Sequence, residues 1–195
     1  MAGAYALAAV GKAILTLLAS ACPRGEFPTA EFELYQAENF VKPMEEGIAL
    51  YLHRVTPANN IRNLSPRIAP DGTRYRPSLP IDLHYLLIPY ARDAFKQQRL
   101  LGWAMRAMED HTIINSGLLN QPGPEPDLFF DAEAVDVIIE TLAIQDMGSI
   151  WEMAKPKIQP AVPYVVRMLL LDSTIEMAEG APVQTRVFGM GEVRP

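Results

Sequence analysis

The segment LPIDLHYLLIPY (79–90) carries the clearest secondary-structure signal in the chain. Apolar residues alternate with other residues along its first half, and this period of two is typical of a β-strand. A second segment, GIALYLHRV (47–55), has apolar residues on both sides of its alternation. That pattern predicts a central strand whose two faces are both covered. The fold is therefore expected to centre on a sheet that contains these two strands.

Helices and further strands are expected around this sheet. The apolar spacing predicts strands at 31–40, 134–144 and 161–172. It predicts a long helix over 91–110, whose core stripe consists of Ala94, Leu101, Met105 and Met108. A short helix is expected over 147–154, with Asp146 as its N-cap, and residues 111–120 are expected to add a helical turn. This order predicts an α+β (mixed α/β) fold in one domain, with a central, mostly antiparallel sheet and helices packed on it.

Residues 56–78 form the longest stretch without a clear period. The segment is rich in turn-forming residues and contains the hairpin-like pair Asp71-Gly72. A loop of this length in a compact domain is usually functional or supported by a partner.

The N-terminal stretch MAGAYALAAVGKAILTLLASACPRG (1–25) predicts an amphipathic helix. Its apolar face is expected to consist of Leu7, Val10, Ile14, Leu17, Leu18 and Ala21. A signal peptide is the alternative, because LASAC resembles a lipoprotein cleavage site. However, no positive charge precedes Lys12, and Lys12 interrupts the apolar run. Since no uncharged apolar run reaches roughly 18 residues, no membrane span is expected.

The overall composition is that of an ordinary soluble chain. Of its 195 residues, 49% are hydrophobic and 21% are charged, which fits one domain with a single core. The net charge is −6 and no Lys/Arg cluster is present, so nucleic acid is not an expected partner. The single cysteine, Cys22, has no partner for an internal disulfide and is expected to pack as a small apolar residue.

Three residues raise the question of a metal site. Asp82 and His84 lie two apart on one expected strand and therefore share a face, and His53 would join them if its strand were a neighbour. A small metal-dependent hydrolase is thus an alternative function. Two-residue spacing without a second cluster is weak evidence, and hydrogen-bonded or solvated side chains are favoured instead. No phosphate-binding loop or nucleophile motif is present, so no catalytic site, metal or cofactor is predicted.

The outward face of the 91–110 helix is the first candidate interface. Its expected members, opposite the core stripe, are Arg92, Lys96, Arg99, Trp103 and Arg106. Tryptophan and arginine are enriched at the energetic centres of protein interfaces. The alternative is a solvated basic face with Trp103 packed under a loop.

Three segments in succession resemble one known family. They are GIALYLHRVTPANNIRN, the pair LPIDLHYLLIPYARD and QRLLGWAMRAMEDH, and MGSIWEMAKPKIQPAVPYVVRMLLLD. The chain resembles the tail-terminator, or cap, proteins of phage-tail-like contractile injection systems. The similarity extends over most of residues 1–175, which would form a tail-terminator-like domain. Residues 176–195 would form a C-terminal arm, without the large extension of longer members.

The resemblance implies a structural assembly protein rather than an enzyme. Family members form a ring, typically six-fold, at the end of the inner tube distal to the baseplate. There they stop tube and sheath polymerisation and anchor the last sheath ring. The implied partners are copies of the chain itself, the inner tube protein and the sheath protein. The chain would be made in the cytoplasm and become part of an assembled particle.

The C-terminal segment EMAEGAPVQTRVFGMGEVRP (176–195) is the second candidate interface. Its alternation predicts a short strand, with Val183, Thr185 and Val187 on one side. Extended segments commonly bind by adding a strand to an exposed sheet edge. The arm is therefore expected to pair with a neighbouring cap subunit or with the terminal sheath ring, or alternatively with its own sheet.

Overall fold

The main sheet has six strands in the order β1-β2-β5-β8-β7-β6. The computed structural model describes residues 3–58, 64–69, 71–121, 128–154 and 159–177. The strands are β1 (Glu31–Tyr35), β2 (Gly47–Pro57), β5 (Leu79–Tyr90), β6 (Ile113–Asn115), β7 (Ala134–Ile139) and β8 (Val162–Leu171). Every neighbouring pair is antiparallel except β1 and β2, which are parallel. The prediction of a mostly antiparallel α+β fold is confirmed.

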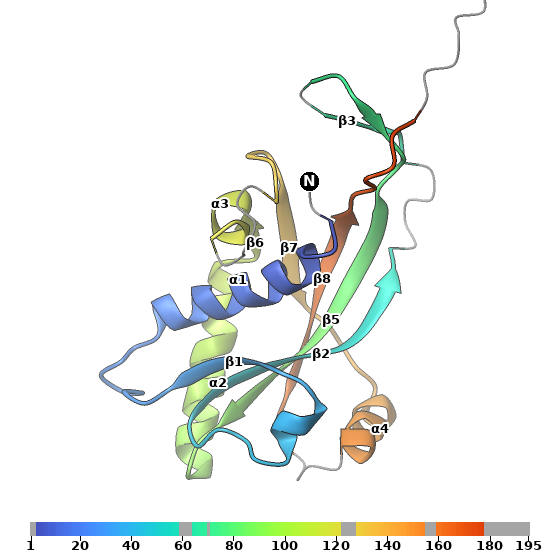
Figure 1. Cartoon of the computed structure of the whole chain (residues 1–195). Helices are drawn as coiled ribbons and strands as arrows, with labels where there is room; N and C mark the ends of the chain where they lie inside the picture. Colours follow the sequence, from blue (N-terminus) through green and yellow to red (C-terminus); the bar gives the residue numbers. More distant parts are fainter. Residues whose placement is uncertain (1–2, 59–63, 70, 122–127, 155–158, 178–195) are drawn as a thin grey trace, which may run out of the picture.

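Helices cover both faces of this sheet (Figure 1). The helices are α1 (Ala6–Ala21), α2 (Ala94–Asp110), α3 (Ser116–Leu119), α4 (Ile144–Ala154) and the 3-10 helix η1 (Ala37–Phe40). The larger apolar cluster lies under α1, α2 and α3, and the smaller one lies between the opposite face and α4 with η1. No helix within the described ranges has the length and apolarity that crossing a bilayer requires.

Strand β5 has the bounds that its sequence pattern predicts, and it lies at the centre of the sheet. Leu83, Tyr85 and Leu87 face the larger cluster, whereas Leu86 and Ile88 face the smaller one. The prolines near its two ends are tolerated because each lies where β5 is registered with only one neighbouring strand. Pro80 is opposite Leu170 of β8, and Pro89 is opposite Ile48 of β2.

The amphipathic N-terminal helix is confirmed. Val10, Ile14 and Leu18 of α1 are buried in the larger cluster. Ala21, which was expected on the same face, is exposed at the last position of the helix. Cys22 follows directly and is buried among apolar residues as expected, and this burial raises the pKa of its thiol.

Two predicted strands are too long. The strand expected at 31–40 ends at Tyr35, because Gln36 and Asn39 bond reciprocally to each other's backbone and start η1. The strand expected at 134–144 ends at Ile139, and α4 already begins at Ile144. Asp146 therefore lies in the first turn of α4 and is not its N-cap.

Two predicted irregular segments contain short strands. In the 56–78 loop, β3 (Arg67–Ile68) and β4 (Arg74–Tyr75) form a hairpin. The Asp71-Gly72 turn is confirmed, since Gly72 has a φ of 87° and Asp71 Oδ1 accepts a hydrogen bond of 2.9 Å from the Thr73 nitrogen. Residues 111–120 contain β6 before the short helix α3, where only a helical turn was expected.

Candidate functional site

The basic residues of α2 are paired with carboxylates. Asp93 caps the helix, because its Oδ1 accepts a hydrogen bond of 2.9 Å from the Lys96 nitrogen. The ion pairs of the helix are Lys96–Glu46, Arg99–Glu26 and Arg106–Asp110, and Arg92, just before it, pairs with Glu45. This face therefore has little net positive charge to offer a partner.

Trp103 is not a free surface residue. Its indole is half-buried against the larger core cluster, with ring centroids 6.4 Å from Phe27 and 6.1 Å from Phe32. The expectation that Trp103 points away from the core is wrong, and the alternative of a packed tryptophan is the observed one. The exposed aromatic residue of α2 is Phe95, which is 72% exposed and which the sequence analysis did not identify.

The buried stripe of α2 differs from the predicted one. Of the expected residues only Met108 is buried, whereas Ala94 is exposed and the other two are half-buried. The buried residues are Leu100, Ala104, Ala107 and Met108. The two alanines on this side are small enough for α2 to pack closely against the core. The hydrophobic pattern alone does not predict whether these alanines or the larger apolar residues of the helix are buried.

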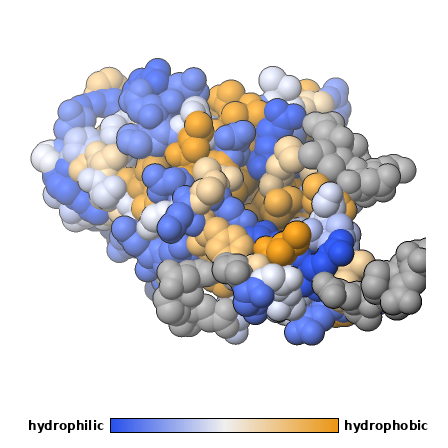
Figure 2. Space-filling model, turned by 90° about the horizontal axis from the view of Figure 1, so that it is seen from above, coloured by the Kyte–Doolittle hydropathy of each residue, from blue (hydrophilic) through white to orange (hydrophobic). Residues whose placement is uncertain are grey.

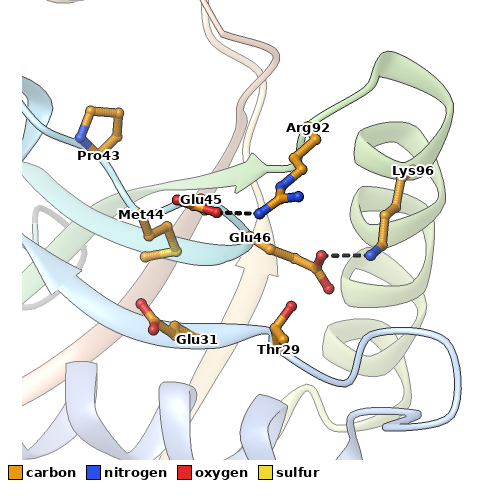
Figure 3. A pocket seen from close by; sticks show the side chains of 8 residues that line it. All are labelled: Thr29, Glu31, Pro43, Met44, Glu45, Glu46, Arg92 and Lys96. Carbon is orange, nitrogen blue, oxygen red and sulfur yellow. Dashed lines mark hydrogen bonds and ion pairs between the residues drawn. The ribbon is translucent and has the colours of Figure 1, made fainter.

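An open pocket of about 580 Å³ lies between the start of β1, the start of β2 and α2 (Figure 3). Glu45 and Glu46 point from the loop before β2 toward Arg92 and Lys96. The Arg92–Glu45 pair is exposed, and ion pairs in contact with solvent contribute little to stability. Glu46 is buried, with Oε2 2.5 Å from the Lys96 ammonium and Oε1 without a hydrogen-bond partner in the described structure.

This pocket connects α2 to one end of the sheet. Its lining consists of Thr29, Glu31, Pro43, Met44, Glu45, Glu46, Arg92 and Lys96. Two of its three carboxylates are neutralised, one by Arg92 just before α2 and one by Lys96 of α2. The arrangement orients the helix against the strand edge and contains no nucleophile with an adjacent general base.

The three residues of the hydrolase alternative do not converge. Asp82 Oδ1 accepts a hydrogen bond of 2.8 Å from the Met168 nitrogen, at a bulge where Met168 has a φ of 57°. His84 contacts Glu140 through Nδ1 at 2.8 Å and Thr56 through Nε2 at 2.9 Å. Among the described residues, no group of three His, Cys, Asp or Glu side chains could hold a metal ion. The geometry therefore gives the hydrolase alternative no support.

His53 lies beside this network because β2 bulges. The register between β2 and β5 shifts between Leu52 and Arg54. As a result, the side chains of His53 and Arg54 both lie near His84. The His53 and His84 ring centroids are 6.2 Å apart, and His53 Nε2 is buried without a hydrogen-bond partner in the described structure. Burial, then the positive charge of Arg54, lowers the pKa of His53 from 6.5 to about 4.

This shift makes stability depend on pH. The folded state keeps His53 neutral, while the unfolded chain takes up a proton below a pH of about 6.5. The His53 contribution is therefore complete above pH 6.5 and is lost as the pH falls toward 4. We expect the thermal midpoint of the wild type to fall more between pH 7 and pH 5 than that of His53→Phe. Equal falls in the two proteins, measured by circular dichroism, would contradict this assignment.

A buried cluster around Arg67 fixes the hairpin to the sheet. The Arg67 guanidinium lies 2.7 Å from Glu133 Oε1 and 2.7 Å from Asp172 Oδ1. It also stacks 4.6 Å from the Phe130 ring centroid. Ser78 donates a hydrogen bond of 2.7 Å to the same Asp172 oxygen. No sequence pattern predicts this cluster, because its members lie up to 105 residues apart, and only the length of the loop indicated that it has a supporting role.

Comparisons with solved structures define the class of fold. The chain is similar to the sheath/tube terminator of PVC, an extracellular contractile injection system, in its extended state. The TM-score is 0.61 and the sequence identity is 12%, and the match covers 96% of this chain and 64% of that one. It is also similar to the tube-terminating cap of the anti-feeding prophage. The TM-score is 0.60 and the sequence identity is 10%, and the match covers 93% of this chain and 60% of that one. This chain therefore spans less than two thirds of the length of either of those two proteins. The fold is that of tube terminators.

A family model identifies the chain more closely. Residues 9–185 match the model described as the Pvc16 N-terminal domain, and the chain belongs to that family. No curated protein gives a significant match. The resemblance to tail-terminator proteins inferred from the three sequence segments is confirmed.

Proposed function

We propose that this chain is a cap that terminates the tube of a contractile injection system. The main observation in support of this proposal is how much of the chain is matched. Two cap or terminator structures match 96% and 93% of the chain, so nearly the whole chain shares their fold. The match to the Pvc16 N-terminal domain supports the same role. The paired charges on α2 and the separated histidine and aspartate residues fit a structural role better than a catalytic one.

The proposed mechanism is ring closure at the end of the tube. Copies of the chain associate head to tail, and six of them close a ring, because heterologous contacts form a ring when the rotation closes. The ring binds the inner tube protein on one face and leaves no site for a further tube ring on the other. It anchors the last sheath ring as well. The chain is made in the cytoplasm and is then built into the particle.

Assembly of the purified chain alone, followed by sedimentation, and with tube protein, followed by electron microscopy, tests this function. The purified chain is expected to form a ring in solution or on tube ends, and to shorten tubes when it is added during polymerisation. Electron microscopy of tube ends and the tube length distribution are the measurements, with bovine serum albumin at equal mass as the control. A strict monomer that also leaves tube ends bare and tube lengths unchanged would contradict the proposal.

The C-terminal arm supplies a second contact in this proposal. Val183, Thr185 and Val187 lie outside the described residues, but Glu176, at the expected start of the arm, pairs with Tyr75 of the same chain. We propose that the segment beyond residue 180 pairs with a neighbouring cap subunit or with the terminal sheath ring. Deleting residues 181–195 is expected to leave the thermal midpoint unchanged and to weaken ring or sheath attachment. A lowered midpoint would instead assign the segment to its own sheet.

A further inference from the structure

The β3–β4 hairpin is a small two-stranded sheet that projects from one end of the molecule (Figure 1). The segment that follows β8 lies alongside β4 and is joined to it by an isolated antiparallel bridge. The Arg76 nitrogen donates a hydrogen bond of 3.0 Å to the Ile175 oxygen, and the Met177 nitrogen donates one of 2.8 Å to the Arg74 oxygen. Together with the Tyr75–Glu176 bridge, these bonds set an antiparallel register.

This register separates the side chains of the hairpin and of residues 175–177 onto two faces. Residues directly opposite one another in an antiparallel ladder share a face, and so do residues two apart on one strand. Arg67, opposite Tyr75, belongs to the inner face, where its guanidinium is held by Glu133 and Asp172. The other set, which we call the hairpin face, consists of Ile68, Arg74, Arg76, Ile175 and Met177.

The hairpin face is exposed and is both apolar and basic. Ile68 is 63% exposed, Ile175 is 51% exposed, and Met177 is 40% exposed. Arg74 and Arg76 are also exposed, and neither forms an ion pair within the described ranges. Figure 2 looks onto the molecule from above, on the side from which the hairpin projects, and shows apolar residues reaching the surface between hydrophilic ones. Such a mixture on a fixed projection is typical of a surface that docks on a protein.

The opposite end of the sheet has the complementary character. Strand β1 is an edge strand, paired only with the first half of β2, and the hairpin lies beyond the other end of β2. On and just after β1 lies a surface that we call the β1 surface, which consists of Glu31, Glu33, Glu38 and Val41. None of these three exposed carboxylates has an ion pair among the described residues, and Val41 is 87% exposed. Lys42 is the one exposed cation next to them in sequence.

We propose that the hairpin face of one copy of this chain binds the β1 surface of the next copy. The inference rests on the proposed function, since it names the contact that closes the ring. Two arginines meet three carboxylates, and exposed aliphatic side chains on the two surfaces are covered together. The two surfaces are different and lie at opposite ends of the molecule, as a head-to-tail contact requires. The Arg67 cluster fixes the projection and hence the angle between neighbouring copies.

A charge exchange between the two surfaces tests this contact. The hairpin variant carries Arg74→Glu and Arg76→Glu, and the edge variant carries Glu31→Lys and Glu33→Lys. Like charges facing each other across an interface repel, so each variant alone is expected to assemble at least about tenfold more weakly than the wild type. An equal mixture of the two is expected to recover assembly, because every contact in an alternating ring then joins opposite charges.

Sedimentation velocity at about 50 mM and about 500 mM salt is the readout, since screening weakens a contact between exposed charges. Arg167→Glu, an exposed change of the same kind on β8, is the matched control and is expected to assemble like the wild type. Thermal unfolding confirms that each variant is folded. If the wild type assembles and both variants assemble equally well, or if both are weak and their mixture is not restored, this contact is wrong. A wild type that neither assembles nor binds tube ends contradicts the proposed function instead.

Discussion

Trp103→Ala is expected to lower the free energy of unfolding by about 2–3 kcal/mol, somewhat less than the roughly 3–5 kcal/mol typical of a fully buried tryptophan. The indole is half-buried and contacts two aromatic rings, those of Phe27 and Phe32. Phe27 is itself 1% exposed, so truncation leaves a cavity that its neighbours only partly fill. Urea unfolding followed by circular dichroism gives the midpoint and the slope from which the change is calculated.

Phe95→Ala is the matched control for this prediction. It removes an aromatic ring from the same helix at a position that is 72% exposed, so its effect on stability is expected to stay within about 0.5 kcal/mol. If Trp103→Ala unfolded at the wild-type midpoint and yet assembled poorly, the original interface assignment of Trp103 would be correct after all.

The errors made on α2 show where sequence periodicity stops being informative. The helix and its amphipathic character follow from spacing, although the helix begins at Ala94, after the cap Asp93, and not at the predicted residue 91. Its orientation does not follow, because alanines and larger apolar residues compete for the buried side. The state of its cations does not follow either. Arg92, Lys96 and Arg99 pair with carboxylates that are 47, 50 and 73 residues away, and only the tertiary structure brings these together.

Strand positions were the most predictable part of the fold, whereas strand irregularities were not predictable. β5 has its expected bounds because both of its faces are buried and its alternation is therefore strongly constrained. The bulge near His53 and the left-handed Met168 leave no mark on hydrophobicity. These two irregularities decide where His53 and Asp82 point. The metal-site hypothesis depended on the orientation of these side chains, which only the three-dimensional structure shows.

The α2 face and the hairpin face also differ in how far the sequence predicts them. The basic α2 face was visible in the sequence and is neutralised in the structure, while Arg74 and Arg76 were hidden in an apparently irregular loop. Their shared face depends on pairing with residues 175–177, about a hundred positions further along the chain. Charge that is available to a partner is thus what remains after the fold has paired its own residues.

Gly47→Ala is expected to be the most damaging single-methyl change in the described chain, with a loss of roughly 3 kcal/mol or more. Gly47 begins β2 with a φ of 151°, a conformation that residues with a side chain rarely adopt. An added Cβ would overlap the Glu31 carbonyl oxygen and would lie 2.6 Å from Met44 Sδ and 2.7 Å from the Glu31 nitrogen. Glu31 is registered opposite Gly47 in the parallel β1–β2 pair, so its backbone has little freedom to move away.

Gly102→Ala makes the same chemical change under opposite conditions. Gly102 is an exposed residue of α2 with nothing within 4 Å of an added Cβ, so alanine is expected to stabilise the helix by about 0.5–1 kcal/mol. Both changes are measured by urea unfolding. Gly47→Ala is expected to affect assembly as well as stability, because displacing β1 disturbs the β1 surface, which includes Glu31 and Glu33. The variant is expected to lose self-association under conditions where circular dichroism still shows folded protein, and wild-type association together with a wild-type midpoint would contradict the strained role assigned to Gly47.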